Sequence, residues 1–222
     1  MTNEQACKPF YTLRYFPVPA RADTCKALLA LSGVEWKLES PAWPKEKDSQ
    51  PVGKMPVLIE AYSGDNATAP FVLGESHAIE EYIATKYNLF YQPDDLQMMA
   101  RQRELRSQMV ELYEYVSDIM HGPEASRAGL LEKYKVAGRY IVRFHEKVLR
   151  ENGSNGHYFG DKTTFADVAA LASVFGLQHT FADLDPSMID FISEDNAPEI
   201  NNLVNTLSKD PALASYVAGF KK

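Results

Sequence analysis

Side chains that commonly do covalent or redox chemistry are scarce in this chain of 222 residues. Its two cysteines, Cys7 and Cys25, do not form a C-x-x-C pair, and two thiols cannot build a disulfide framework or a metal cluster. None of the five histidines has the spacing of metal ligands. Neither G-x-G-x-x-G nor a P-loop occurs, which weakens a phosphate-binding interpretation. A thiol–disulfide oxidoreductase and a metal site are therefore not expected.

A few polar residues are suited to binding an anion. Ser76 follows Glu75 at the start of an expected helix, and a helix N-terminus presents free N–H groups to an anion. From the residues alone, a plain N-cap with an acidic first turn is the more ordinary interpretation. Lys47 and Lys54, with the indole N–H of Trp43, suit a carboxylate, although an isolated lysine is usually a solvated surface charge.

The first part of the chain, residues 1–86, must position these side chains, and it mixes strand and helix patterns. Strands are expected at Phe10–Phe16, Val34–Leu38, Met55–Glu60 and Phe71–Leu73. A helix over Ala20–Ser32 is expected to hold Pro19 in its first turn and to end at Gly33. A loop with a turn of helix is expected over Pro41–Pro51, a turn over Ser63–Asn66 and a helix from Glu75 to Lys86. The order β-α-β-loop-β-β-α predicts a compact α/β layer, too short for a doubly wound nucleotide fold.

The second part of the chain reads almost wholly as helix. Helices are expected over Leu96–Met120, Glu124–Glu151, Thr164–Thr180 and Glu199–Phe220. Thr164 and Asp167 form a capping box, worth about 1 kcal/mol, to which we assign no catalytic role. We predict an α/β domain over residues 1–86, a linker over 87–95 and an all-helical domain over 96–222.

Composition narrows the functional classes. Hydrophobic residues make up 45% and charged residues 24%, which is enough apolar material to exclude disorder of the whole chain. The net charge of −7 gives no basic footprint for nucleic acid. No run of about 18 apolar residues predicts a membrane span, and the first ten residues lack a signal pattern. We therefore expect a cytoplasmic protein that binds neither nucleic acid nor membrane.

Several motifs, taken together in this order, resemble the cytosolic glutathione transferases. The matching segments are Tyr11–Phe16 with Arg21, Lys26–Ala30, Ala42–Lys47, Pro51–Leu58, Gly74–Ile79 and Thr164–Asp167. They span nearly the whole chain, and no single one is decisive. The tyrosine start and the Trp-Pro-x-x-Lys loop are most similar to the sigma class, whereas Phe16–Val18 is similar to the pi class.

The resemblance implies a thioredoxin-like domain that binds glutathione and a helical domain that supplies the electrophile pocket. Tyr15 is then the catalytic residue, whose hydroxyl donates to the glutathione sulfur. A free thiol has a pKa of about 8.5, and lowering it by about two units requires roughly 2.7 kcal/mol. Tyr11 is the competing tyrosine, and the spacing to Pro17 and Arg21 favours Tyr15. The alternative is that Tyr15 is a core aromatic residue.

The resemblance also implies the remaining glutathione contacts. The Met55–Pro56 bond is expected to be cis, with the Met55 backbone pairing with the cysteinyl part, although an ordinary turn proline is the alternative. Ser76 is expected to hold the γ-glutamyl carboxylate and Glu75 the γ-glutamyl ammonium. Trp43, Lys47 and Lys54 would hold the glycyl carboxylate. Arg21 would tune the field at the thiolate or pair with an acid.

The electrophile pocket and the subunit contacts are harder to assign. Phe16, Val18, Met109, Tyr113 and Phe220 are candidate pocket residues. The stripe of Met109, Tyr113 and Val116 serves a helix-packing core equally well. Ser107 stands where related enzymes place an acid from the partner subunit, so that contact is not expected here and the γ-glutamyl ammonium would rely more on Glu75. Val52 stands where some classes place an aromatic key, so a flatter and more polar dimer interface is expected.

The leading interpretation is a homodimeric glutathione transferase that transfers alkyl or aryl groups to glutathione in detoxification. Its partners would be glutathione and a small hydrophobic electrophile, with no cofactor beyond the co-substrate glutathione. A glutathione-dependent isomerase similar to prostaglandin D synthase is one alternative. A non-catalytic ligand-binding homologue on the same scaffold is the other.

Overall fold

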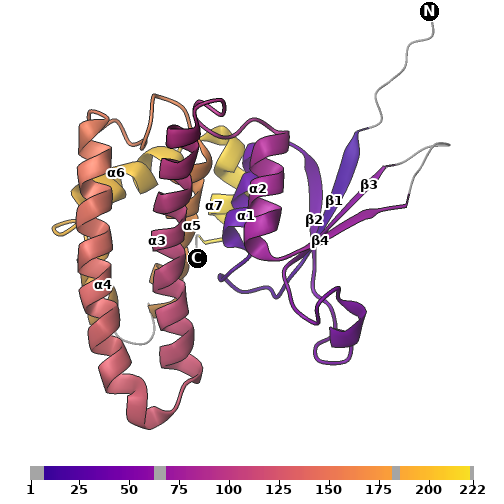
Figure 1. The fold of residues 1–222 in the computed structure, drawn as a ribbon, viewed down its shortest axis with the longest axis horizontal. Coiled ribbons are helices and arrows are strands. Elements are labelled where there is room, and N and C mark those ends of the chain that lie inside the picture. The colour runs from indigo at the N-terminus through magenta and orange to yellow at the C-terminus, as the bar shows by residue number, and fades with distance from the viewer. Residues whose placement is uncertain (1–7, 63–68, 182–185, 221–222) are drawn as a thin grey trace, which may run out of the picture.

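The N-terminal part is a four-stranded sheet, which a computed structural model of the chain places beside a set of helices (Figure 1). The structure describes residues 8–62, 69–181 and 186–220. The strands are β1 (Pro9–Arg14), β2 (Glu35–Glu39), β3 (Val57–Tyr62) and β4 (Phe71–Gly74), and they lie in the order β2-β1-β3-β4. β1 runs parallel to β2 and antiparallel to β3, and β3 runs antiparallel to β4. This mixed sheet confirms the predicted order.

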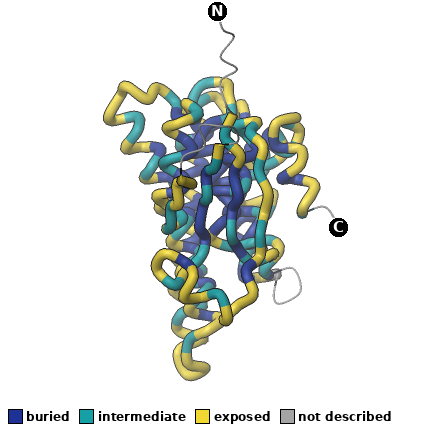
Figure 2. The backbone as a smooth tube through the Cα atoms, turned by 90° about the vertical axis from the view of Figure 1, so that its right-hand side faces the viewer, coloured by how far each residue is buried: buried dark blue, intermediate teal, exposed yellow. Residues whose placement is uncertain are grey.

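Burial follows strand position in the sheet. Tyr11, Leu13 and Leu58 on the two central strands are completely buried, whereas Phe71 and Val72 on β4 are exposed (Figure 2). Helices α1 (Asp23–Leu31) and α2 (Ser76–Lys86) cover the sheet face that looks toward the helical part (Figure 1). The central strands are thus covered by neighbouring strands and helices, and they form a rigid platform.

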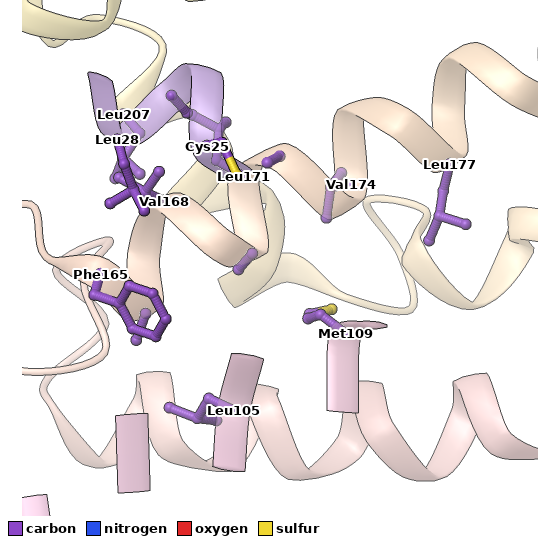
Figure 3. Close-up of a cluster of buried hydrophobic side chains, with 14 of the residues drawn as sticks. Cys25, Leu28, Leu105, Met109, Phe165, Val168, Leu171, Val174, Leu177 and Leu207 are labelled. Carbon is purple, nitrogen blue, oxygen red and sulfur yellow. The ribbon is translucent and has the colours of Figure 1, made fainter. Parts of the chain in front are cut away.

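The helical part consists of α3 (Leu96–His121), α4 (Glu124–Glu151), α5 (Phe165–Phe181), α6 (Pro198–Leu207) and α7 (Ala214–Ala218). Short 3-10 helices lie at η1 (Lys47–Ser49), η2 (Pro186–Ile192) and η3 (Pro211–Leu213). α5 is apolar around almost its whole circumference, so it must be buried on all sides. It lies between α1 and α3, and its Leu171 belongs to the same buried hydrophobic cluster as Cys25 and Leu28 of α1 and Leu105 of α3 (Figure 3). One core therefore joins the sheet part to the helical part.

The structure corrects three details of the predicted elements. α1 begins at Asp23, so Pro19 precedes the helix and does not lie in its first turn. The helix expected over Glu199–Phe220 is three pieces, because Pro211 lacks the N–H that a continuous helix would need. The η2 segment was not anticipated.

Gly33 has a φ of 67° just after α1, as expected for a C-cap. The turn expected at Ser63–Asn66 falls outside the described residues.

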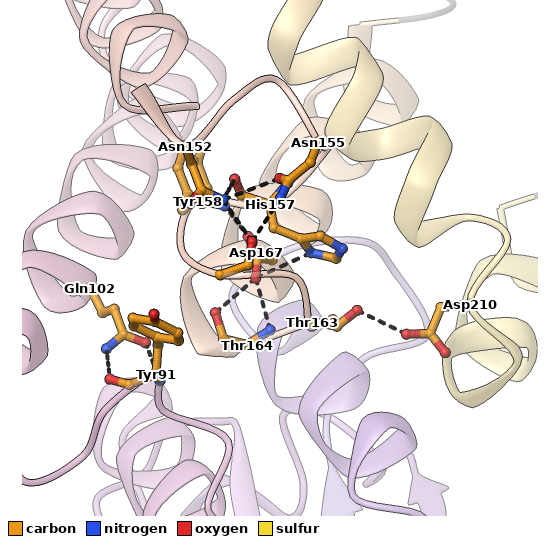
Figure 4. A network of polar contacts seen from close by, with 11 residues as sticks. Tyr91, Gln102, Asn152, Asn155, His157, Tyr158, Thr163, Thr164, Asp167 and Asp210 are labelled. Carbon is orange, nitrogen blue, oxygen red and sulfur yellow. Dashed lines mark hydrogen bonds and ion pairs between the residues drawn. The ribbon is translucent and has the colours of Figure 1, made fainter. Parts of the chain in front are cut away.

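A polar network fixes the loop between α4 and α5 (Figure 4). Asp167 accepts from the Thr164 N–H at 2.8 Å, from the Thr164 hydroxyl at 2.7 Å and from the Tyr158 N–H at 2.7 Å. Asn152 donates to the carbonyls of His157 and Gly160. The Asp167 half of the predicted capping box is therefore present, whereas the Thr164 hydroxyl donates to the Asp167 carboxylate, which also orders the preceding loop.

A buried histidine lies behind this loop. The Nδ1 atom of His145 is 2.5 Å from the Tyr158 hydroxyl, and its Nε2 atom is 3.0 Å from Gln108 Oε1. Burial lowers the pKa of His145 to about 3, so the ring is neutral at ordinary pH. With the amide oxygen of Gln108 as an acceptor, the ring carries its proton on Nε2 and accepts the tyrosine hydroxyl on Nδ1. Through these two contacts His145 connects α4 to α3 and to the loop before α5.

Two ion pairs connect α2 to α3. Arg106 binds both carboxylate oxygens of Glu80, at 2.6 and 3.0 Å, and both side chains are buried. Arg103 binds Glu81 in the same bidentate way at 2.9 and 2.7 Å, but nearer the surface.

Within the described part of the chain, no helix has the combination of length and hydropathy that crossing a bilayer requires.

Candidate functional site

A cavity of about 470 Å³ opens at one edge of the sheet. Its walls are formed by Arg21, Trp43, Lys47, Gly53, Lys54, Met55, Pro56, Glu75 and Ser76. Every predicted glutathione-binding residue except Tyr15 is in this set. Gly53 also lines the cavity, although it was not predicted to do so. Its φ of 60° explains why the turn between Val52 and Lys54 needs a glycine.

Sheet pairing explains why segments distant in the sequence meet here. Arg14 at the end of β1 is paired with Val57 at the start of β3, and Val57 is paired with Gly74 at the end of β4. Tyr15, Pro56 and Glu75 are the next residues along each strand, so they leave the sheet at the same edge. The Met55–Pro56 bond is cis, as predicted, and the Trp43–Pro44 bond is cis as well.

The N-terminus of α2 forms one wall of the cavity. Glu75 has a φ of 68°, an uncommon conformation for a residue other than glycine, and it is held by the Ile79 N–H donating to its carbonyl at 3.0 Å. Among the described side chains, none caps this helix. Since its first N–H groups are not capped, they are available to an anion beside Ser76.

The charges around the cavity are mostly positive. Arg21, Lys47 and Lys54 line it together with the single carboxylate of Glu75. This set complements a ligand that has two carboxylates and one ammonium, which is the charge pattern of glutathione. The Lys47 side chain lies against Gly53, where an added Cβ would be 3.6 Å from Lys47 Cε. The loop before β3 therefore helps to hold this lysine in the wall.

Tyr15 lies directly after β1 and is only 6% exposed. Its N–H donates to the Glu39 carbonyl at 3.0 Å, and the Lys26 ammonium is 5.7 Å from the centre of its ring. Burial raises the pKa of its hydroxyl to about 12, and the nearby Arg21 backbone opposes this rise only in part. Tyr15 therefore keeps its proton and remains a hydrogen-bond donor beside a residue of the cavity wall.

Tyr11, the competing tyrosine, is engaged elsewhere. It is completely buried, its hydroxyl is 2.6 Å from the Tyr87 hydroxyl, and the Lys86 ammonium is 5.6 Å from its ring centre. Burial and the Tyr87 contact raise its pKa far above the ordinary value. Tyr11 is therefore part of a structural cluster at the end of α2.

A second, smaller hollow of about 30 Å³ lies between the two parts of the chain and shares Arg21 and Ser76 with the larger cavity. Asp23 lines it, with Oδ1 2.8 Å from the Lys26 ammonium and with Oδ2 unpartnered among the described groups. Burial raises the pKa of Asp23 to about 6. Sequence reasoning did not single out Asp23; the only signal was an acid at an otherwise apolar position of its helix.

The residues assigned to the electrophile pocket are dispersed. The Phe16 ring lies 5.6 Å from the Tyr15 ring and 5.7 Å from the Trp43 ring, so it adjoins the cavity. Val18 is 48% exposed. The Tyr113 hydroxyl donates to two carbonyl oxygens of α5, each at 3.3 Å. Phe220 belongs to an aromatic cluster with Phe175, Tyr216 and His179.

Met109 has a different environment from the other pocket candidates. It is 2% exposed and is packed in the hydrophobic cluster between α3 and α5 (Figure 3). Val116, on the same helix stripe, is also buried. At these two positions the stripe is a helix-packing surface, the second of the two interpretations that its spacing allowed. Ser107, for which no partner contact is expected, and Val52 at the expected flat interface are both exposed.

The four-stranded mixed sheet followed by an all-helical part matches the architecture of the glutathione transferases. Residues 114–219 match the family model described as "Glutathione S-transferase, C-terminal domain". The "Glutathione S-transferase class-mu 28 kDa isozyme" of Schistosoma japonicum is 29% identical over 213 residues, which cover 93% of this chain and 96% of that protein. "S-crystallin 4" of Enteroctopus dofleini is 24% identical, covering 94% of this chain and 96% of that protein.

Solved structures show the same fold. The sigma class glutathione transferase of Fasciola hepatica superposes with a TM-score of 0.77 at 20% identity, covering 96% of this chain and 98% of that one. The structure titled prostaglandin synthase D of Nilaparvata lugens has a TM-score of 0.69 at 17% identity, covering 94% and 97%. The helical part of the chain thus matches the C-terminal domain of the glutathione transferases, and nearly the whole chain is similar to members of that family and to the S-crystallins.

Proposed function

We propose that this protein activates glutathione as a thiolate through Tyr15 and conjugates it to small hydrophobic electrophiles. The observation that carries the proposal is the convergence at one sheet edge of the predicted glutathione residues, with Tyr15 leaving β1 at the same edge. The similarity of the chain to glutathione transferases supports the general activity.

The charged groups around the cavity suggest how the tripeptide lies. The γ-glutamyl carboxylate would bind the N–H groups at the start of α2 and the Ser76 hydroxyl, while Glu75 accepts from the ammonium. Lys47, Lys54 and the Trp43 indole would receive the glycyl carboxylate at the other end of the cavity. The central cysteinyl part would then pair with the Met55 backbone, which directs its sulfur toward the end of β1.

The chemical step needs one proton removed and one charge stabilised. The thiol gives its proton to solvent water, which leaves a sulfur anion, and the Tyr15 hydroxyl donates a hydrogen bond to that anion while keeping its own proton. Its pKa of about 12 favours this role, because a neutral phenol is the donor that the anion requires. Holding the thiolate beside a bound electrophile makes the addition effectively unimolecular.

A glutathione-dependent isomerase is the second candidate. It is favoured by the likeness of the fold to a structure titled prostaglandin synthase D, and the same thiolate would serve both reactions. A panel of electrophiles and peroxides, assayed with glutathione beside an isomerase substrate, separates them. Binding of glutathione without turnover on any member would favour a non-catalytic homologue, a possibility also raised by relatives named S-crystallins.

Glutathione binding is tested by changing the wall at α2. Glu75→Ala and Ser76→Ala are each expected to weaken glutathione affinity about tenfold or more, because a charge-assisted hydrogen bond contributes roughly 1.5–3 kcal/mol. Isothermal titration calorimetry measures the effect. Glu124→Ala, which removes an exposed acid from the first turn of α4, is the matched control and should bind as the wild type does. Wild-type affinity in both α2 variants would remove these residues from the site.

The proposal includes a cytoplasmic homodimer. The chain has a mass of 24.9 kDa, so sedimentation at micromolar concentration is expected to give a species of about 50 kDa. The exposed Val52 would lie in a comparatively flat contact. A stable species of the single-chain mass under these conditions would contradict the dimer while leaving the glutathione site in place.

A further inference from the structure

The helical part carries a second large hollow, far from the sheet. This α4 groove, of about 560 Å³, lies among α4, η2 and the start of α6, and α4 is at the side of the molecule opposite the sheet (Figure 1). Its volume is within the range of about 300–1,000 Å³ that is usual for small-molecule sites. None of the glutathione-site predictions involves it.

Four cationic side chains of α4 line the groove: Lys135, Arg139, Arg143 and Arg150. The first three are spaced four residues apart, so they lie in one row along the helix. Within the described part of the chain, Lys135 and Arg139 have no hydrogen-bond or ion-pair partner, and Arg143 only stacks on the Tyr140 ring at 4.9 Å. Like charges four residues apart on a helix repel one another and destabilise it. The protein as a whole has a charge of −7, so this positive row is a local exception.

The acids that line the groove are already engaged. Glu146 is buried and accepts from the N–H groups of Glu199 and Ile200 at 3.2 and 2.8 Å, which caps the start of α6. Its Oε2 atom is also 3.5 Å from Arg150. Asp190 accepts from the Asn196 amide at 3.3 Å. Among the described residues, neither carboxylate forms an ion pair with Lys135, Arg139 or Arg143, and the lining as a whole has four cations against two acids.

Close packing of η2 against α4 forms the base of the groove. Phe191 of η2 lies so close to α4 that a Cβ on Gly138 would be 2.6 Å from its ring, and the same ring contacts Tyr134. Phe191 and Val142 are buried, so they form an apolar floor beneath the cations. A floor of this kind excludes water from one side of a bound anion and strengthens its attraction to the charges above.

The spacing of the charges indicates what the groove would accept. Successive cations in the row are about 6 Å apart along the helix axis, since four residues rise about 1.5 Å each. A single phosphate would meet one or two of them, whereas a compound with two or three phosphate groups would meet the whole row. Arginine guanidinium groups also match phosphate oxygens in pairs. We propose that the α4 groove is a binding site for a small organic polyphosphate, separate from the glutathione site.

The test is a calorimetric titration of the full-length protein with inorganic tripolyphosphate at low salt. The wild type is expected to bind one equivalent. The double variant Arg139→Gln/Arg143→Gln is expected to bind at least tenfold more weakly, because it removes two of the three charges in the row. Both arginines are exposed, and an unchanged thermal midpoint with unchanged glutathione affinity establishes that the variant is folded.

Lys147→Gln is the matched control, since it removes a cation from the same helix that pairs with Glu151 and does not line the groove. An equal loss of tripolyphosphate binding in Lys147→Gln would overturn the proposal, and so would a wild type that does not bind millimolar tripolyphosphate. A lipid headgroup is the other source of the same chemistry. If the wild type, but not the double variant, sediments with anionic phospholipid vesicles, the groove binds a lipid headgroup, and the assignment to a free organic polyphosphate is wrong.

Discussion

Replacing Tyr15 with phenylalanine is expected to slow conjugation at about pH 6.5 by at least tenfold while glutathione affinity changes little. The substitution keeps the ring, with its contacts to Phe16 and Lys26, and removes the hydroxyl. A thiol with a pKa of about 8.5 is about one per cent ionised at this pH. If the hydroxyl lowers that pKa by about two units, roughly half of the bound thiol is ionised in the wild type, so its loss removes most of the reactive species.

The pH profile distinguishes loss of the donor from a packing defect. In Tyr15→Phe the acidic limb of the rate profile is expected to move upward by about two pH units, toward that of the free thiol. Tyr11→Phe is the matched control, because its hydroxyl contacts Tyr87 away from the cavity, and it should keep wild-type turnover. Unchanged turnover in Tyr15→Phe, or an equal loss in Tyr11→Phe, would remove Tyr15 from the chemical step.

The parts of the fold that depend on local chemistry could be predicted from the sequence. The aromatic run at Phe10–Phe16, the capping pair Thr164 and Asp167, and the glycine after α1 each act within a few residues, so the pattern is sufficient. The start of α1 at Asp23 was placed wrongly, and the interruption before Pro211 was missed, because apolar periodicity continues through both positions. A proline or a polar turn ends such a helix without changing the hydrophobic pattern around it.

The candidate site was predictable only through the resemblance. Trp43, Met55 and Ser76 lie in separate segments, and each alone is more often an ordinary loop, turn or cap residue. What unites them is the pairing of Arg14 with Val57 and of Val57 with Gly74, which is a long-range property. The stripe of Met109 and Val116 shows the converse, because apolar residues at helical spacing look the same whether they face α5 or a ligand.

The ion pair of Glu80 and Arg106 could not be anticipated from the sequence, yet removing it is expected to have the largest effect on stability. Arg106→Met is expected to lower the free energy of unfolding by about 3–5 kcal/mol, because it leaves a buried carboxylate without its cation. Glu80 is 1% exposed, and burial raises its pKa, so the arginine is what favours its charged form. Urea unfolding at fixed protein concentration measures the change.

The neighbouring pair provides the control. Arg103→Met removes the same kind of bidentate contact between the same two helices, but the Arg103 side chain is 41% exposed. Its loss should lower the free energy of unfolding by no more than about 1 kcal/mol. The double variant Glu80→Leu/Arg106→Met should recover most of the stability, because it removes the buried charge together with its partner. Equal losses from the two arginine variants would show that burial does not set the strength of these contacts.

The pH dependence of the free energy of unfolding is an independent test of the unpaired Glu80 carboxylate. In Arg106→Met the folded-state pKa of Glu80 would rise further above its unfolded value, since its only described cationic partner is gone. A group whose pKa is raised by folding loses stability as pH rises through the folded-state pKa. The deficit of Arg106→Met relative to the wild type should therefore be small near pH 4 and grow as the pH approaches neutrality. A deficit that is constant across this range would mean that lost packing by the arginine stem, and not an unpaired carboxylate, weakens the junction between the sheet and the helices.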